Sequence, residues 1–242
     1  MSYSGLVDEF DRRVALCESD LQLRALLDEV MREMGFDYFA LLHHASLGRR
    51  ATGFVRVDSY PEGWEEELVG SGLIGCDPVH VASGRTQAAF RWDELGRFAA
   101  IGPLQREVLE RSARFGLGTG FTVPANVPGE PAGSCSFAVR RGRGLPRPAL
   151  GCAELVGAHA FRAARRLRGM PADVASTPRL SRREAQCLQF VAAGKTDWEI
   201  AMILGIGHET ARQYVKSLRR RLGVVSRAQL AVRGLRDGLI SF

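Results

Sequence analysis

The sequence lacks the features of membrane, secreted and disulfide-rich proteins. No apolar run in the 242 residues approaches the roughly 20 that a bilayer-spanning helix needs. Residues 1–20 mix acidic and basic side chains and have no basic start followed by an apolar core, so no secretory signal is expected. The five cysteines are an odd number without a Cys-x-x-Cys pair. These absences predict a protein of the reducing cytoplasm that does not contact a membrane.

The sequence also lacks a convincing catalytic, metal-binding or cofactor motif. The glycine-rich segment 116–120 does not have the Gly-x-Gly-x-x-Gly spacing of a dinucleotide site and leads into a predicted strand. His43 and His44 alternate across a strand, which disfavours shared metal ligation. Cys76 and His80 have no partner at the spacing of a nucleophile and its base. We therefore expect neither an enzyme nor a cofactor-dependent protein.

Positive charge is concentrated in the last quarter of the chain. Residues 176–242 contain 12 Lys and Arg against 5 Asp and Glu, whereas residues 1–175 contain 21 against 22. The length is sufficient for two domains. This asymmetry indicates a basic domain that binds a polyanion, joined to a near-neutral domain with another task.

The first part of the chain alternates helical and strand patterns. An apolar stripe predicts a helix over 21–36, with Ser19 and Gln22 as its capping box. Further helices and strands are expected at 102–116 and 149–169, and at 37–45, 52–60, 119–127 and 132–140. Short connections between the strands favour antiparallel pairing. We therefore predict an α+β protein whose N-terminal domain is an α/β/α sandwich around a central antiparallel sheet.

The segment 170–179 contains two prolines and small residues but no apolar stripe, which is typical of a linker. It predicts a division into domains at 1–169 and 180–242.

The C-terminal segment has the pattern of four short helices. Capping boxes are formed by the pairs Ser181/Glu184, Thr196/Glu199 and Ser226/Gln229. Gly194 and Gly205 are suited to end the first two helices. Residues 208–223 have an apolar residue at each turn of one face. The tight Gly-Ile-Gly link before this helix predicts an all-α helix-turn-helix domain.

The third of these helices has a polar, cationic face that suits DNA. Short hydrogen-bonding side chains can reach base edges, while cations contact phosphates. A solvated basic helix is the alternative, but this helix lies in the one basic region of the chain. The predicted contact residues are Thr210, Arg212, Gln213, Lys216, Ser217, Arg219 and Arg220.

Residues 178–240 resemble the DNA-binding domain of LuxR-type regulators. The matching residues are Leu180-Ser-x-x-Glu184, Leu188, Ala193-Gly194-Lys195-Thr196, Glu199-Ile200-Ala201, Leu204, Thr210, Val215 and Leu222-Gly223-Val224. Ala211 and Tyr214 depart from the usual Val and the frequent His. The resemblance implies that Lys195 and Thr196 also belong to the DNA-binding surface. It further implies a homodimer on pseudo-palindromic promoter DNA, with RNA polymerase as a further partner.

The N-terminal domain is similar to the acyl-homoserine lactone receptors of this family. A phosphorylated receiver is not expected, because the chain begins with a helical pattern and has no strand that ends in paired carboxylates. The receptor motif is matched by Tyr60-Pro61-x-x-Trp64, Asp77-Pro78-Val79, Trp92, Phe115-Gly116, Gly120 and Thr122-Val123-Pro124.

The resemblance implies a lactone-binding site whose polar groups complement the signal. The indole N–H of Trp64 suits the ring carbonyl, the Asp77 carboxylate suits the amide N–H, and the Tyr60 hydroxyl suits the amide carbonyl. The predicted site is completed by Pro78, Trp92 as an apolar wall, and Ser136 as a further hydroxyl.

Leu68 departs from the receptor pattern, which usually has Tyr four residues after the Trp. One helical turn separates the two positions, so Leu68 should face the same cavity as Trp64. This change predicts an atypical acyl group, such as a branched or aromatic one. The competing hypothesis is a ligand-independent or non-lactone-responsive LuxR-type DNA-binding regulator whose N-terminal domain mainly dimerises, and a receptor for another small signal is a further alternative. The apolar face of 149–169 is the predicted dimer seam.

Overall fold

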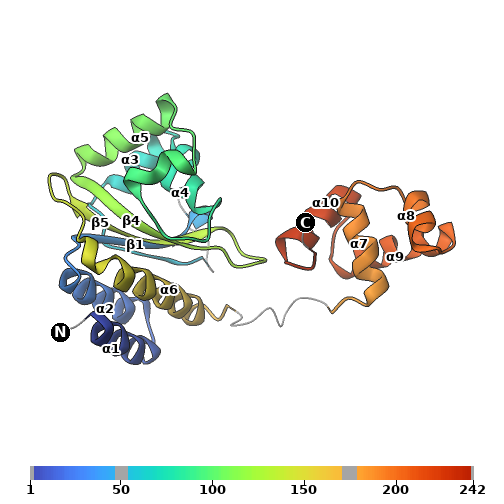
Figure 1. Cartoon of the computed structure of the whole chain (residues 1–242), viewed down its shortest axis with the longest axis horizontal. Coiled ribbons are helices and arrows are strands. Elements are labelled where there is room, and N and C mark those ends of the chain that lie inside the picture. The colour runs from blue at the N-terminus through green and yellow to red at the C-terminus, as the bar shows by residue number, and fades with distance from the viewer. Residues whose placement is uncertain (1–2, 47–53, 171–178, 241–242) are drawn as a thin grey trace. The chain divides into compact units, whose positions relative to one another are not determined.

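The computed structural model describes residues 3–46, 54–170 and 179–240. They form two compact units, one from most of the first 170 residues and one mainly from residues after 178 (Figure 1). The predicted domain boundaries stay a prediction, and most of the expected linker 170–179 lies outside the described residues. In the described ranges, no helix combines the length and apolar character needed to cross a bilayer.

The first unit is built on one antiparallel sheet with the strand order β2-β1-β5-β4-β3. The strands are β1 (Tyr38–His43), β2 (Arg56–Asp58), β3 (Phe90–Arg91), β4 (Leu117–Ala125) and β5 (Gly133–Arg140). All four strand pairs are antiparallel, as the short connections predict. The four expected strands are therefore confirmed, and the two-residue strand β3 is an addition. Residues 47–53, which include the first two residues of the expected strand 52–60, lie outside the described residues.

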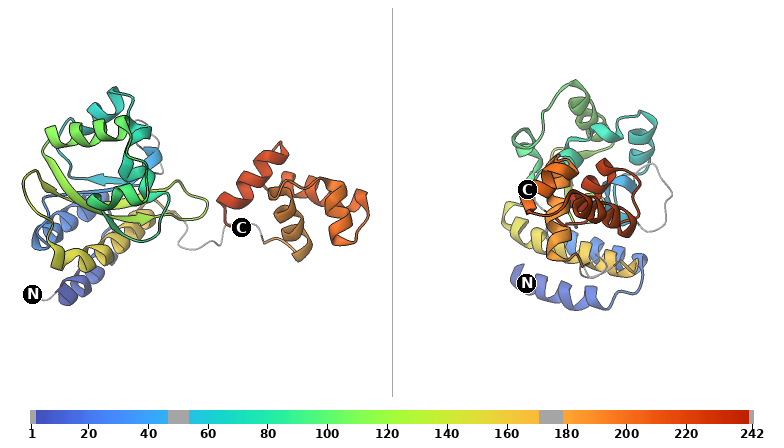
Figure 2. Two further views of the ribbon diagram at one scale, coloured as in Figure 1. Left: turned by 45° about the horizontal axis from the view of Figure 1, so that its top comes forward. Right: turned by 90° about the vertical axis from the view of Figure 1, so that its right-hand side faces the viewer.

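Helices cover both faces of this sheet (Figures 1 and 2). One face is covered by α1 (Tyr3–Ala15), α2 (Asp20–Glu33) and α6 (Leu150–Leu167). The other is covered by α3 (Trp64–Gly70), α4 (Pro78–Ser83) and α5 (Pro103–Arg114). Residues 133–139 of β5 are all buried because the strand is covered on both sides. The predicted α/β/α sandwich is confirmed.

The apolar face of α6 has a different role from the predicted one. Val156, Ala160 and Phe161 are at most 3% exposed and belong to the core that α6 shares with the sheet, α1 and α2. Of the large apolar side chains of this helix, Leu155 is half-exposed. Because the fold itself covers this apolar face, it is not available as the predicted dimer seam.

The start of α2 also differs in detail from the expected capping box. Ser19 accepts a hydrogen bond from the Gln22 backbone, as predicted. The Gln22 side chain, however, accepts from the backbone N–H of Glu18 at 2.7 Å rather than from that of Ser19. The cap therefore reaches one residue further back along the chain.

The described residues of the second unit form four helices: α7 (Arg182–Ala192), α8 (Asp197–Leu204), α9 (His208–Arg221) and α10 (Arg227–Arg236). The three predicted capping boxes are present at the starts of α7, α8 and α10. Gly194 and Gly205 have positive φ angles, which explains why glycine follows α7 and α8. Leu188, Ile200, Leu218 and Leu230 are completely buried between the helices. The helix-turn-helix prediction is confirmed.

All five cysteines are reduced. Cys17, Cys135, Cys152 and Cys187 are buried, whereas Cys76 is partly exposed. Burial raises the pKa of each of the four buried thiols.

Candidate functional site

The segment 59–78 contains α3 and the 3₁₀ turn Ile74–Cys76, and it ends at Pro78, the first residue of α4. Gly63 has a φ of +81°, so the chain can turn sharply into α3 and place Trp64 at its first position. Asp77 is the N-cap of α4, and Pro78 occupies the first turn of that helix. Trp64 and Asp77 therefore occupy helix starts, where local backbone geometry fixes their position.

The sheet supplies the opposite wall through alternate residues of its strands. Ser136 of β5 is paired with Ala40 of β1 and with Thr122 of β4. Side chains two residues apart on a strand share a face, so Ser134 lies on the same face as Ser136. Asp58 of β2 is paired with Ala40, so the cross-strand neighbours Thr122, Ser136, Ala40 and Asp58 form one row across the sheet.

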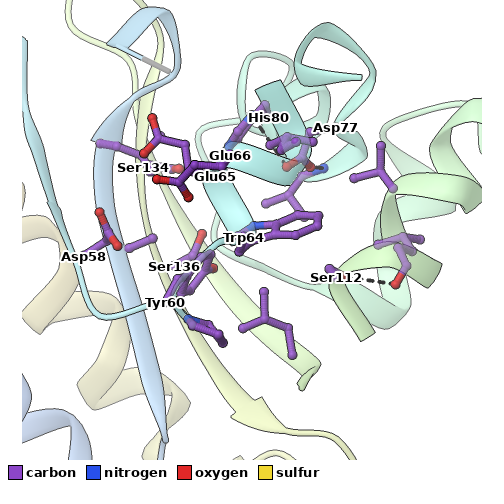
Figure 3. Close-up of a pocket in the computed structure, with 18 of the residues that line it drawn as sticks. Asp58, Tyr60, Trp64, Glu65, Glu66, Asp77, His80, Ser112, Ser134 and Ser136 are labelled. Carbon is purple, nitrogen blue, oxygen red and sulfur yellow. Dashed lines mark hydrogen bonds and ion pairs between the residues drawn. The ribbon is translucent and has the colours of Figure 1, made fainter. Parts of the chain in front are cut away.

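A cavity of about 220 Å³ lies between this sheet face and the helices α3, α4 and α5. Figure 3 shows Tyr60, Ser134 and Ser136 on the sheet side, with Trp64, Asp77 and His80 opposite. Its lining contains six of the seven predicted ligand residues: Tyr60, Trp64, Leu68, Asp77, Trp92 and Ser136. Their ligand roles stay a prediction.

Leu68 and Pro78 occupy different positions relative to this cavity. Leu68 is 3% exposed and lines the cavity one turn after Trp64, the placement that helical spacing predicts. Pro78 is buried in the first turn of α4 and does not line the cavity. Pro78 therefore starts helix α4, directly after the N-cap residue Asp77.

A chain of hydrogen bonds fixes the floor of the cavity. The indole Nε1 of Trp92 donates to Thr122 Oγ1 at 2.9 Å, and Thr122 Oγ1 is 2.9 Å from Ser136 Oγ. Trp92 lies directly over Gly120, where an added Cβ would be 2.5 Å from the ring. Glycine is therefore needed at this point of β4 for the indole to lie against the sheet.

The side chains of Asp77 and Tyr60 are both constrained by their surroundings. Asp77 is 8% exposed, and its Oδ1 accepts from the backbone N–H of Val79 at 2.8 Å. Burial, followed by the nearby Asp77 charge, raises the pKa of the Tyr60 phenol well above its usual value. Tyr60 therefore keeps its O–H as a hydrogen-bond donor, and Asp77 Oδ2 is not used by the helix cap.

The cavity also contains polar residues that the sequence analysis did not assign to the site. Ser134 and His80 line it, together with Arg56 and the acidic residues Asp58, Glu62, Glu65 and Glu66. The spacing of Ser134 and of His80 from predicted site residues could have indicated both. Ser134 lies two residues before Ser136 on one strand face, and His80 lies three residues after Asp77.

The predicted DNA-binding face of α9 is exposed. Ala211, Val215 and Leu218 are buried against the other helices, which directs Gln213, Lys216 and Arg220 to the opposite side. Exposed side chains on this helix also include Thr210 and Arg212, and Ser217 is partly exposed. The helix therefore presents polar and cationic groups together on one surface.

Four of the predicted DNA contacts have other bonds in the free protein, and one of them is Arg212, whose guanidinium lies 3.4 Å from the Glu209 carboxylate. The guanidinium of Arg219 donates to the carbonyl of Val225, which ties it to the turn after α9. Thr196 caps α8, and Lys195 Nζ lies 3.3 Å from Glu199. The DNA roles of all these residues stay predictions.

Comparison with known proteins matches two families to the two units. The family described as "Autoinducer binding domain" matches residues 19–164, and "Bacterial regulatory proteins, luxR family" matches residues 178–233. Together with the cavity and the helix-turn-helix, they define a ligand-responsive DNA-binding regulator. The chain belongs to the LuxR family of bacterial transcriptional regulators and carries an autoinducer-binding domain; it is not an enzyme.

Individual relatives agree with this assignment. The chain is 30% identical over 200 residues to the putative HTH-type transcriptional regulator y4qH of Sinorhizobium fredii, covering 81% of this chain but 60% of that protein. It is 27% identical to the transcriptional activator AhyR of Aeromonas hydrophila, covering 99% and 94% of the two chains. The crystal structure of Escherichia coli SdiA has the same fold, with a TM-score of 0.65, 23% identity and complete coverage of both chains.

Proposed function

We propose that this regulator binds an acyl-homoserine lactone in the cavity of its N-terminal unit and, as a cytoplasmic homodimer, binds pseudo-palindromic promoter DNA. The observation that carries the ligand assignment is the convergence of Tyr60, Trp64 and Asp77 on one cavity. They provide two donors and one acceptor, the complement of two carbonyls and one amide N–H.

The roles follow from the hydrogen-bonding capacity of each side chain. Trp64 Nε1 donates to the ring carbonyl, and Asp77 Oδ2 accepts from the amide N–H. Tyr60 donates to the amide carbonyl, and Ser136 adds a second hydroxyl. Trp92 covers the ring with its flat indole. A buried polar group left without a partner costs about 1–3 kcal/mol, so this set favours the lactone over ligands that lack these groups.

The ligand assignment is tested by thermal denaturation of the full chain with a set of acyl-homoserine lactones. A ligand that binds only the folded state raises the melting temperature progressively with its concentration. The ring-opened acyl-homoserine is the matched control, because its carboxylate would be buried near Asp77 and should give no shift. A melting temperature that no lactone changes would instead support a ligand-independent regulator whose N-terminal unit mainly dimerises.

The DNA assignment rests on the exposed face of α9. A helix-turn-helix places its second helix in the major groove, and a dimer binds two half-sites. In this chain α9 follows the tight turn after α8 and carries the polar, cationic surface. RNA polymerase is a further partner in this proposal, since the AhyR relative is named as a transcriptional activator.

The Lys216→Ala variant is expected to weaken binding to operator and unrelated DNA by similar factors. Lys216 is exposed on the side of α9 opposite its buried residues, so we assign it to a phosphate. Loss of one phosphate contact should reduce the slope of log affinity against log salt concentration by about 1. The measurement is a fluorescence-anisotropy titration over a salt series.

Arg182→Ala is the control for this experiment. It removes the same charge from the exposed first residue of α7, a different helix from α9. Its salt slope should equal that of the parent. Equal slopes for parent and Lys216→Ala would remove Lys216 from the DNA contact surface.

A further inference from the structure

The residue that caps the end of helix α6 is bound to the outer edge of the sheet. Arg168 is the C-cap of α6, and Gly169 then turns the chain out of the helix with a φ of +63°. The Arg168 side chain is only 13% exposed, and an arginine that is covered to this extent is normally paired. It lies a few residues before the chain passes from the first unit to the second.

The guanidinium of Arg168 holds three elements together. It donates to both carboxylate oxygens of Asp20, the first residue of α2, at 2.8 and 3.0 Å. It also donates to the carbonyls of Phe54 at 2.5 Å, Arg56 at 3.4 Å and Ala164 at 3.0 Å. The planar fork of five N–H donors allows these bonds to be made at once, which the single ammonium of a lysine does not.

The carbonyls of Phe54 and Arg56 belong to the free edge of the sheet. Among the described strands, β2 is outermost and pairs with β1 alone. The carbonyl of Val55 accepts from the backbone N–H of His43 in β1 at 2.9 Å. Successive carbonyls of a strand point to opposite sides, so those of Phe54 and Arg56 point away from β1. An edge strand leaves such groups without a strand partner, and Arg168 supplies the missing donors.

Arg56 connects this edge to the cavity. Its side chain lines the cavity and forms an ion pair with Glu65 of α3, the residue directly after Trp64. Its backbone carbonyl accepts from Arg168. The strand β2 is only three residues long and has few contacts of its own, so its position depends on these partners. Contacts therefore run without interruption from the helix that carries Trp64 to the end of α6.

We propose that Arg168 is the positioning residue through which occupancy of the cavity is passed to the linker and so to the DNA-binding unit. A lactone held by Trp64 fixes α3, and Glu65 then holds Arg56 and β2 in place. The β2 carbonyls in turn hold Arg168, which fixes the direction in which the chain leaves α6. This inference rests on the proposed function and goes beyond it by naming the residue that couples ligand binding to DNA binding.

The quantity that tests this role is the coupling factor between the two sites. If the lactone raises the affinity for operator DNA by some factor, the operator raises the affinity for the lactone by the same factor. The probes are the acyl-homoserine lactone that raises the melting temperature most, in tritiated form, and a duplex selected from random DNA by the lactone-loaded chain. Equilibrium dialysis of the lactone against the full chain, with and without saturating duplex, should give a factor of roughly five or more for the parent.

Arg168→Lys keeps the charge but loses the fork that joins Asp20 to the two β2 carbonyls. Its coupling factor should fall to within about twofold of 1, while its lactone affinity without DNA stays within about threefold of the parent. A residue that only stabilises the fold would leave this factor unchanged, because the folded protein is the same in both dialysis measurements.

Two further variants locate the effect. Asp20→Asn removes the charged partner of Arg168 and should lower the coupling factor to less than about half of the parent value. Arg162→Lys is the matched control. It makes the same substitution on α6, at a side chain that is 69% exposed and donates to Asp11, and it should keep the full factor.

Each outcome is decisive. A parent-like coupling factor in Arg168→Lys, or in Asp20→Asn if Arg168→Lys does not fold, would overturn the role of Arg168. Loss of lactone binding by folded Arg168→Lys in the absence of DNA would also overturn it, since the residue would then act on the cavity itself. If the lactone binds the parent with the same affinity whether or not the duplex is present, the inference is wrong and the lactone assignment stands. If no lactone or no duplex binds the parent, the proposed function and this inference fall together.

Discussion

The Asp77→Asn variant is expected to require roughly ten to a hundred times more lactone for half-maximal response than the parent. The substitution keeps the volume of the side chain but removes the charge of the acceptor that we assign to the ligand amide. Hydrogen bonds to charged groups contribute about 1.5–3 kcal/mol, which corresponds to this change in affinity.

The helix cap makes this substitution more damaging. Asp77 Oδ1 accepts from the Val79 backbone, and asparagine is also a good N-cap. The Asn oxygen will therefore remain at the start of α4. Its NH₂ group then takes the place of Oδ2 and directs N–H bonds at the N–H of the ligand, so two donors face each other.

A reporter dose–response curve gives the measurement, and Trp64→Phe is the comparison. That change removes one neutral donor and keeps the aromatic ring, so it should cost about 0.5–1.5 kcal/mol of binding energy, less than Asp77→Asn. The isolated segment 176–242 should retain any DNA binding of its own. A normal half-maximal concentration and maximum for Asp77→Asn would return Asp77 to the role of a helix cap alone.

The Gly120→Ala variant is expected to lower both the free energy of unfolding and the response to ligand. A Cβ at this position would be 2.5–2.8 Å from three atoms of the Trp92 ring. The indole must then move, which breaks its bond to Thr122 and displaces the wall proposed for the lactone ring. Overpacking of this kind costs about 1–3 kcal/mol of stability. Denaturant unfolding and the reporter response measure the two effects.

Gly151→Ala is the matched control for this prediction. Gly151 is exposed in α6, and an added Cβ would have no atom within 4 Å. Alanine is the better helix former, so this variant should be as stable as the parent or more stable by up to about 1 kcal/mol. A parent-like stability for Gly120→Ala would show that Trp92 can move without loss.

The parts of the fold that were predictable from sequence have local causes. Each capping box of the helix-turn-helix joins residues three positions apart, and Gly205 ends α8 through its own backbone conformation. The longer strands β1, β4 and β5 contain enough residues for a strand pattern to be recognised in the sequence. The strand β3 is only two residues long and cannot show one, which explains its absence from the prediction.

The parts that were not predictable depend on contacts distant in sequence. The apolar face of α6 identifies a buried surface but does not specify whether the sheet or a second subunit covers it. The meeting of Ser134 with His44 and His80 depends on the pairing of β1 with β5 and on the position of α4. Similarly, nothing in the α9 pattern indicates that Arg219 bonds to Val225.

The distribution of the cysteines makes the native chain suitable for site-selective chemical labelling. Thiolate is the reactive form of cysteine, and burial both raises the pKa of Cys17, Cys135, Cys152 and Cys187 and shields their sulfur atoms. Cys76 is partly exposed and directly precedes Asp77. A maleimide fluorophore would therefore attach beside the proposed amide acceptor without any engineered substitution. Such a probe would report occupancy of the cavity in real time, independently of transcription.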